Sequence, residues 1–457
     1  MNKSLVFGLF ILANLFSAVS FGFSVSNYPY GLIIVLLYFV FTRKVKLGIR
    51  KPFLTISLFV AIYSVLSVLM IFINPALQVT AIENIALCVA YFSYILFFIQ
   101  FSFYEIVIGT MIGFLPITLY SIFIELPLYF FQKPLLFSFR EAIGLRNTYV
   151  SPPLAFFIEG SQAPAAYILL IQNISIFAIF KRYYSSNFIR KPLFKFFLFC
   201  ELVVALSHIS GMQFISFWFP LLLFIASITV LQLVSSDSAF LRLKKKVSIK
   251  TIFSVITFIS SSFLWLPYLI DKFTTSYAID HSASSRFLSF FTGLYDAMHN
   301  LFMPLGIAEF KVSRLESLAH ILNNDSLSAI HGWLLRASSL GVISDDAATY
   351  SLVGYFFSET GFLAILFFTP FFTNFFKTLS ITIIHTKHSN NSLSFKLAMI
   401  CALGAPTMYL FNMCLGYPRV MPYALLSLFI SWKLIGYLSK DDRSLDFNNL
   451  ISTNKVT

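Results

Sequence analysis

Charged residues are scarce in this chain of 457 residues. They make up 11% of the sequence, against about a quarter in ordinary soluble domains. Hydrophobic residues make up 58%, and the mean hydropathy is +0.83. This composition excludes a water-soluble globular domain, because too few polar residues are present to cover an apolar core of this size.

Cysteine is also scarce, and the motifs of common cofactor sites are missing. The four cysteines lie singly within apolar runs without a Cys-x-x-Cys pair, so they are interpreted as small buried hydrophobic residues. The sequence has no His-Glu-x-x-His motif, no paired-aspartate motif and no cluster of Cys and His, so we expect no metal. It has no glycine-rich phosphate loop either, which argues against nucleotide hydrolysis and leaves no cofactor to expect.

Positive charge exceeds negative charge, but it is divided among short segments between apolar runs. The formal net charge is +13, which could suggest a nucleic-acid partner. The sequence has no basic groove interleaved with aromatic residues, no zinc-finger spacing and no helix-turn-helix pattern. Nucleic acid is therefore not an expected partner, and basic loops between apolar runs are typical of membrane proteins.

About a dozen apolar runs approach the length that crosses a bilayer as a helix, about 20 residues. Period-2 alternation is absent, which favours helices over a β-barrel. The predicted fold class is an all-α polytopic integral membrane protein with about 12 transmembrane helices, and the 57 phenylalanines are expected to face lipid. The predicted spans are 5–23, 28–42, 53–73, 81–100, 104–124, 164–180, 196–210, 213–234, 251–270, 351–372, 397–415 and 420–438.

The basic residues predict how the protein is oriented. Twelve spans place both termini on one side, and 23 of the 32 Lys and Arg residues then fall in segments on that side. Because cytoplasmic loops carry the excess of Lys and Arg, we predict cytoplasmic termini.

Two long loops on the outer side divide the chain. The smaller one covers 125–163 and the larger one 271–350, and the larger loop holds four of the seven histidines. The chain then consists of N-terminal helices (1–124), the smaller loop, central helices (164–270), the larger loop, C-terminal helices (351–438) and a polar tail (439–457). We expect the chemistry of the protein to be concentrated in the two loops.

Short amphipathic helices are predicted within the larger loop. One is opened by Arg286, ended by 304–306, and carries apolar residues at helical spacing, namely Phe287, Phe291, Leu294, Met298 and Leu301. A capping box of Ser313 and Glu316 predicts a second helix that closes at 323–324. Both are too short to span, and we expect them to lie on the bilayer surface or to cover a cavity.

Arginines of the outer loops are candidates for binding a pyrophosphate. A guanidinium group can hold phosphate oxygens bidentately, and two such groups from separate loops would stabilise the charge of a departing pyrophosphate. The alternative interpretation is that these side chains reach lipid headgroups. Arg286 and Arg146 are the principal candidates, and the full set is Arg140, Arg146, Arg286 and Arg314.

Attack by a sugar hydroxyl requires a base. The candidates are Glu159 in the smaller loop, His299 on the first amphipathic helix and His331, because each can accept a proton near neutral pH in a suitable environment. A surface role for the histidines remains the alternative. Supporting roles are predicted for Glu201 and Glu359, which are ionisable residues within spans, and for His208, although 207–211 also reads as a simple tight turn.

Four segments occur in an order that resembles a known family. They are Arg146 to Leu169 with Glu159-Gly160-Ser161, Ser207 to Gly211, Arg286 to Gly306, and Tyr350 to Phe362 with Glu359-Thr360-Gly361. In this order they resemble the bacterial O-antigen polymerase family (Wzy-type), relatives of the O-antigen ligases. Gly160 stands where that family usually has proline.

The resemblance covers roughly residues 140–370 and implies a metal-independent membrane glycosyltransferase with a GT-C-like fold. Its substrate would be an undecaprenyl-pyrophosphate-linked oligosaccharide at the periplasmic face of the bacterial inner membrane, in lipopolysaccharide O-antigen biosynthesis. Membrane lipid and a chain-length regulator protein would be its partners.

Other functions stay open at this point. An O-antigen ligase would use the same arginines, and His331 in Ile330-His331-Gly332 fits that reading. A flippase for the same lipid also has about twelve spans, but the long outer loop argues against it. A structural membrane protein without catalysis is the remaining alternative.

Overall fold

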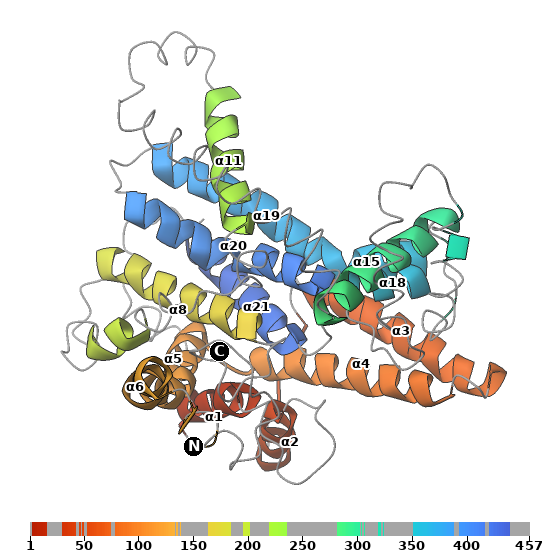
Figure 1. Cartoon of the computed structure of the whole chain (residues 1–457), viewed down its shortest axis with the longest axis horizontal. Helices are drawn as coiled ribbons and strands as arrows, with labels where there is room; N and C mark the ends of the chain where they lie inside the picture. Colours follow the sequence, from red (N-terminus) through yellow and green to blue (C-terminus); the bar gives the residue numbers. More distant parts are fainter. Residues whose placement is uncertain are drawn as a thin grey trace. The chain divides into compact units, whose positions relative to one another are not determined.

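The computed structural model describes residues 2–15, 30–42, 45–46, 48–49, 53–74, 78–132, 134–135, 138, 163–183, 195–201, 219–234, 281–301, 303, 306, 319–320, 323, 351–387, 393–415 and 420–438. Within these ranges the regular elements are helices and none is a strand, which confirms the all-α class (Figure 1). Five of the helices are long and apolar enough to cross a membrane, and five shorter ones are also apolar. The chain is therefore a helical, multi-pass membrane protein in outline, while the count of twelve spans stays a prediction.

The chain divides into two compact units. The first unit comprises residues 1–68, 82–224 and 365–457, and the second comprises 69–81 and 225–364. The helices are α1 (Lys3–Leu15), α2 (Gly31–Phe41), α3 (Phe53–Ile73), α4 (Gln78–Phe98), α5 (Phe103–Tyr120), η2 (Ser121–Glu125), α6 (Leu126–Phe131), α8 (Ala163–Tyr183), α11 (Phe219–Val234), α15 (His281–His299), α18 (Leu352–Thr360), η6 (Gly361–Leu363), α19 (Ala364–Lys387), α20 (Leu393–Leu415) and α21 (Met421–Leu438).

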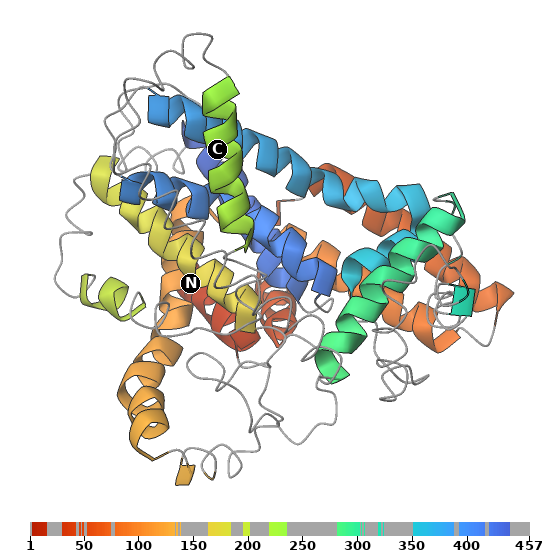
Figure 2. The ribbon, with the colours of Figure 1, turned by 45° about the horizontal axis from the view of Figure 1, so that its top comes forward.

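The helix of the fifth predicted span extends beyond the predicted end at residue 124. Helix α5 continues through the π-helical turn η2 into α6 without a break (Figure 2), so the first residues of the predicted smaller loop are helical. Glu125, in η2, is fully buried, and its carboxylate accepts a 3.4 Å hydrogen bond from the Ser121 hydroxyl. The remaining predicted spans coincide with helices wherever the chain is described, except that 196–210 is described only up to 201 and 251–270 lies outside the described ranges.

Phenylalanine supplies much of the core of the first unit. Phe7 and Phe10 of α1 and Phe97 of α4 are at most 1% exposed, and the rings of Phe10 and Phe97 lie 5.0 Å apart. Aromatic pairs at this distance add to the stabilisation that burial provides. The expectation that the phenylalanines only face lipid is therefore wrong, although others, such as Phe72 at 80% exposed, do lie on the surface.

Segments predicted to lie on the cytoplasmic side meet at one end of the first unit. The side chain of Gln100, after α4, accepts from the Lys46 N–H and donates to the Lys46 carbonyl, both at 2.8 Å. The Lys3 ammonium group donates to the Gln100 carbonyl at 3.5 Å. Lys3, Lys46 and the end of α4 thus lie together at one end of the first unit, while the side of the membrane on which they lie stays a prediction.

Helix α20 contains Pro406 in its interior, and side chains of neighbouring helices bind the carbonyl groups one turn before it. Proline has no N–H for the carbonyl four residues earlier, and that carbonyl, of Ala402, accepts a 3.0 Å bond from the Gln172 amide of α8. The Leu403 carbonyl accepts from the side chains of Asn374, Thr378 and Ser431 at 2.7–3.1 Å. Polar side chains of α8, α19 and α21 therefore join these helices to α20.

Asn374→Ala is expected to lower the stability of the first unit by about 1 kcal/mol. The substitution removes the amide that donates to the Leu403 carbonyl and the oxygen that accepts from Ser431, and such interhelical bonds contribute about 0.6–1.7 kcal/mol in membranes. The measurement is the unfolding midpoint in detergent micelles. Thr369→Ala is the matched control, because its hydroxyl is exposed and bonds only to α19 itself; equal effects of the two substitutions would contradict the prediction.

Candidate functional site

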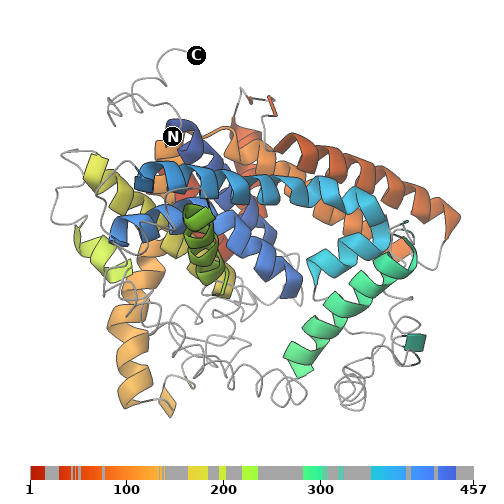
Figure 3. The same cartoon turned by 90° about the horizontal axis from the view of Figure 1, so that it is seen from above.

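The candidate site lies in the second unit, where α15 packs against α18. The two helices run side by side in the same direction (Figure 3). A Cβ atom added to Gly293 would lie 2.4 Å from the Gly354 carbonyl oxygen, and one added to Gly354 would lie 2.5 Å from the Ser289 carbonyl oxygen. The backbones are thus in direct contact, as small residues allow at helix interfaces in membranes.

The face of α15 that meets α18 is made of small and polar residues. Ser289, Thr292, Gly293, Asp296 and Ala297 are buried, whereas Met298 and Leu301 are 64% and 79% exposed. The predicted amphipathic helix is confirmed as a helix, but Met298 and Leu301 of its predicted apolar stripe do not pack on α18. Its position on the bilayer surface stays a prediction.

A buried carboxylate, one helical turn after Gly293, forms a hydrogen bond between α15 and α18. The Ser358 hydroxyl of α18 donates a 3.1 Å hydrogen bond to the Asp296 carboxylate, and both residues are buried, with exposures of 0% and 3%. A hydrogen bond to a charged group contributes more than one between neutral groups. Asp296 therefore fixes the C-terminal half of α15 against α18.

Glu359 follows Ser358 and is fully buried. Its carbonyl accepts a 3.4 Å bond from the Gly306 N–H, so the segment after α15 returns to the end of α18. Gly361 then ends α18 with φ of 54°, a conformation that costs little only for glycine. The tenth predicted span is therefore interrupted at Gly361 and continues as η6 and α19.

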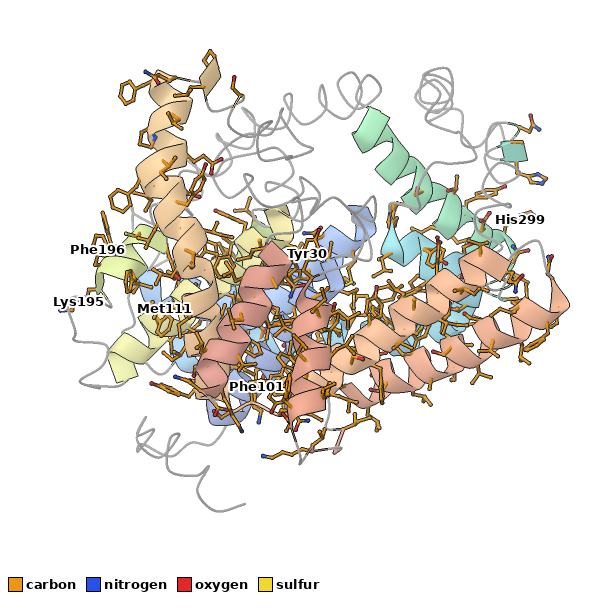
Figure 4. All side chains as sticks on the ribbon, turned by 90° about the horizontal axis from the view of Figure 1, so that it is seen from below. Tyr30, Phe101, Met111, Lys195, Phe196 and His299 are labelled. Atoms are coloured by element: carbon orange, nitrogen blue, oxygen red, sulfur yellow. The ribbon has the colours of Figure 1, made fainter. Side chains whose placement is uncertain are left out.

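His299 is the last residue of α15 and is exposed (Figure 4). Its ring stacks between Tyr295, with centroids 5.7 Å apart, and His320, at 5.8 Å. An exposed imidazole three residues from the buried Asp296 can serve as a general base, provided that a substrate hydroxyl reaches it.

Three predicted site residues, Arg286, His299 and Glu359, thus lie on the packed pair α15 and α18. Helix α15 begins at His281, so the prediction that Arg286 opens it is wrong; five helical residues precede it. The helix also ends at His299, before the predicted stop at 304–306, and Leu301 follows with φ of 50°. Six predicted site residues lie outside the described ranges, namely Arg140, Arg146, Glu159, His208, Arg314 and His331.

Sequence reasoning missed Asp296, Ser358 and His320. Asp296 shares its helical face with Ser289, Thr292 and Gly293 at spacings of three and four residues, and this small-residue stripe was a readable signal. The contact of His320 with His299 joins residues 21 positions apart, and no local pattern indicates it. Within the described ranges, no group of three His, Cys, Asp or Glu side chains is placed to hold a metal ion.

Glu201, predicted to support the site, belongs to the first unit. It ends the helical segment 195–201 and is 1% exposed. The side chain that interacts with its carboxyl group is Asn173 of α8, which is also buried.

Comparison of the chain with protein-family models, with curated proteins and with solved structures finds no match.

Proposed function

We propose that this protein is a metal-independent membrane glycosyltransferase that polymerises undecaprenyl-pyrophosphate-linked oligosaccharide repeats at the periplasmic face of the bacterial inner membrane. One observation supports the proposal most directly. The segments 286–306 and 350–362, which carry the resemblance to O-antigen polymerases, are about 60 residues apart, yet they pack through Gly293, Gly354 and the Asp296–Ser358 hydrogen bond. Segments that serve one site would be expected to meet in this way.

In the proposed reaction, a hydroxyl group of an incoming lipid-linked repeat attacks the anomeric carbon of the growing chain. The new glycosidic bond forms as the bond from that carbon to the pyrophosphate oxygen breaks, so undecaprenyl pyrophosphate leaves with the electron pair. His299 takes the hydroxyl proton, with Glu159 and His331 as the other candidate bases. Arg286 and Arg146, assisted by Arg140 and Arg314, would stabilise the charge of the departing pyrophosphate.

The test is a gel of surface lipopolysaccharide from a strain that lacks only this gene. The proposal expects core carrying a single repeat in place of the long ladder. Bare core with lipid-linked polymer outside would instead indicate a ligase, which His331 would fit, and single lipid-linked repeats trapped inside would indicate a flippase. An unchanged ladder would leave a structural role and contradict the transferase.

His299→Ala is expected to lower the rate of polymer synthesis by roughly 100-fold or more, the contribution typical of a general base. The measurement is polymer formed per unit time by purified protein in lipid vesicles supplied with lipid-linked repeats. His320→Ala removes the ring stacked on His299 but leaves His299 itself in place. The rate of polymer synthesis should therefore fall by less than about tenfold, well short of the loss expected when a general base is removed. A His299→Ala protein as active as the wild type would remove His299 from the reaction.

A further inference from the structure

The first unit contains a buried carboxyl group that the proposed sugar chemistry does not use. Glu201 is almost completely buried. The buried polar and charged side chains in the described part of the chain include four carboxylic acids but no lysine, arginine or histidine. Glu201 thus has no buried cation among these residues, although a charged carboxylate removed from water needs one to offset its lost hydration.

Asn173 on α8 is the polar side chain that interacts with Glu201. It is 2% exposed, and among the described residues neither its amide nitrogen nor its amide oxygen makes a hydrogen bond of ordinary geometry. The same holds for both carboxyl oxygens of Glu201. Two neighbouring side chains, each more than nine-tenths buried, therefore share four polar atoms whose hydrogen-bonding capacity the described protein leaves unused, which is uncommon in folded proteins.

Hydrogen-bonding chemistry decides which form of Glu201 suits this neighbour. A carboxylate can only accept, so it could pair with the amide nitrogen of Asn173 but would leave the amide oxygen facing another oxygen. A protonated carboxyl group has one donor and one acceptor, and a carboxamide has both as well. The neutral acid can donate to the Asn173 oxygen and accept from its nitrogen at the same time.

We propose that Glu201 and Asn173 form a proton-binding site in the interior of the first unit, in which the bound proton lies between the Glu201 carboxyl and the Asn173 amide oxygen. Uptake converts the carboxylate and one proton from water into the neutral acid, and release reverses this step. The site does not rest on the proposed transferase activity. The protein would then contain, in the interior of the first unit, a carboxyl group that binds and releases a proton.

The surrounding titratable groups favour the neutral acid. Cys200, beside Glu201 in the chain, is the titratable group that interacts with it electrostatically. Helix α8 carries Tyr167, and the helices packed on it carry Cys401 and Tyr409 on α20, Tyr423 on α21 and Glu105 on α5, with Glu125 in the following η2. The basic residues of these segments are Lys181 and Arg182 of α8, Lys195 in the segment of Glu201, Lys396 of α20 and Lys433 of α21. Among the described side chains, none of them is an interaction partner of Glu201, whose side-chain partner is the neutral Asn173.

The first experiment measures the infrared C=O stretching band of protonated carboxyl groups in the full-length protein in lipid vesicles. At neutral pH, we expect this band in the wild type and its loss in Glu201→Gln, with a shifted band in Asn173→Leu, because the hydrogen bond to the carboxyl is removed. Glu83→Gln is the matched control, since Glu83 is exposed near the start of α4, and it should leave the band unchanged. An identical spectrum for the wild type and Glu201→Gln would overturn the proposal.

Thermal unfolding supplies an independent measurement, because glutamine has nearly the same shape as the neutral acid and can form the same two bonds with Asn173. Glu201→Gln is expected to unfold within about 1 °C of the wild type, a change that corresponds to about 1 kcal/mol in a chain of this size. A Glu201→Gln protein that unfolds far below the wild type, or fails to fold, would mean that Glu201 is charged and paired, and would also overturn the proposal.

Discussion

Gly354→Ala is expected to separate α15 from α18 and to abolish polymer synthesis. The added methyl group would lie 2.5 Å from the Ser289 carbonyl oxygen, a backbone atom that cannot move without moving the whole of α15. Forcing a group into packed space costs about 1–3 kcal/mol and sometimes more, and we expect the upper end of this range. The measurements are the unfolding midpoint in micelles and the lipopolysaccharide ladder of a strain that carries only the variant.

The control for Gly354→Ala is Gly436→Ala in α21. A Cβ atom at Gly436 meets no atom within 4 Å, and alanine is the better helix former by about 1 kcal/mol. This substitution should therefore be neutral or slightly stabilising. If both variants unfold at the wild-type midpoint, α15 and α18 are not packed as closely as described.

Arg286→Ala is expected to remove the long polysaccharide while leaving the amount of protein in the membrane unchanged. Loss of one group that stabilises developing charge in a transition state typically costs roughly 100- to 1,000-fold in rate. Arg286→Lys should also fail, because lysine lacks the planar fork that binds two phosphate oxygens. The measurements are the lipopolysaccharide ladder and an immunoblot of the membrane fraction.

Lys311→Ala, in the same loop, is the control for a general loss of positive charge and should keep the ladder. A normal ladder in the Arg286→Ala strain would remove this residue from the proposed pyrophosphate site. Full activity of Arg286→Lys together with an inactive Arg286→Ala would mean that charge alone is needed at this position.

The helical membrane class could be predicted from the sequence because long apolar runs satisfy their backbone hydrogen bonds internally only as helices. The twelve runs did not reveal where helices break or continue. The turn at Gly361 depends on a positive φ, which hydropathy does not record. The extension of α5 through η2 into α6 was missed because a loop was predicted to begin at Glu125, although the residues after it are apolar and the Glu125 carboxylate is buried against Ser121.

The candidate site was predictable only in part, because contacts between distant segments are not visible in the local sequence. Glu359 stood out as an ionisable residue within a predicted span, and His299 as the histidine on the predicted amphipathic helix that carries Arg286. Asp296 did not, since it sits among the acidic residues of a long loop, and its importance follows from burial against Ser358. The apolar pattern of α15 gave no sign of its contact with α18, because two helices in a membrane approach most closely through their small residues.

The bonds made by Gln172 also bear on how the protein is assembled during synthesis. Gln172 of α8 donates to carbonyl groups 230 and 255 residues later in the chain. At a translation speed of 5–20 residues per second, these partners leave the ribosome roughly 10–50 s after α8 does. During that interval the Gln172 amide of α8 lacks these partners and must form its hydrogen bonds with water, the insertion machinery or other proteins. The packing of the first unit can therefore be completed only after α20 and α21 have been inserted.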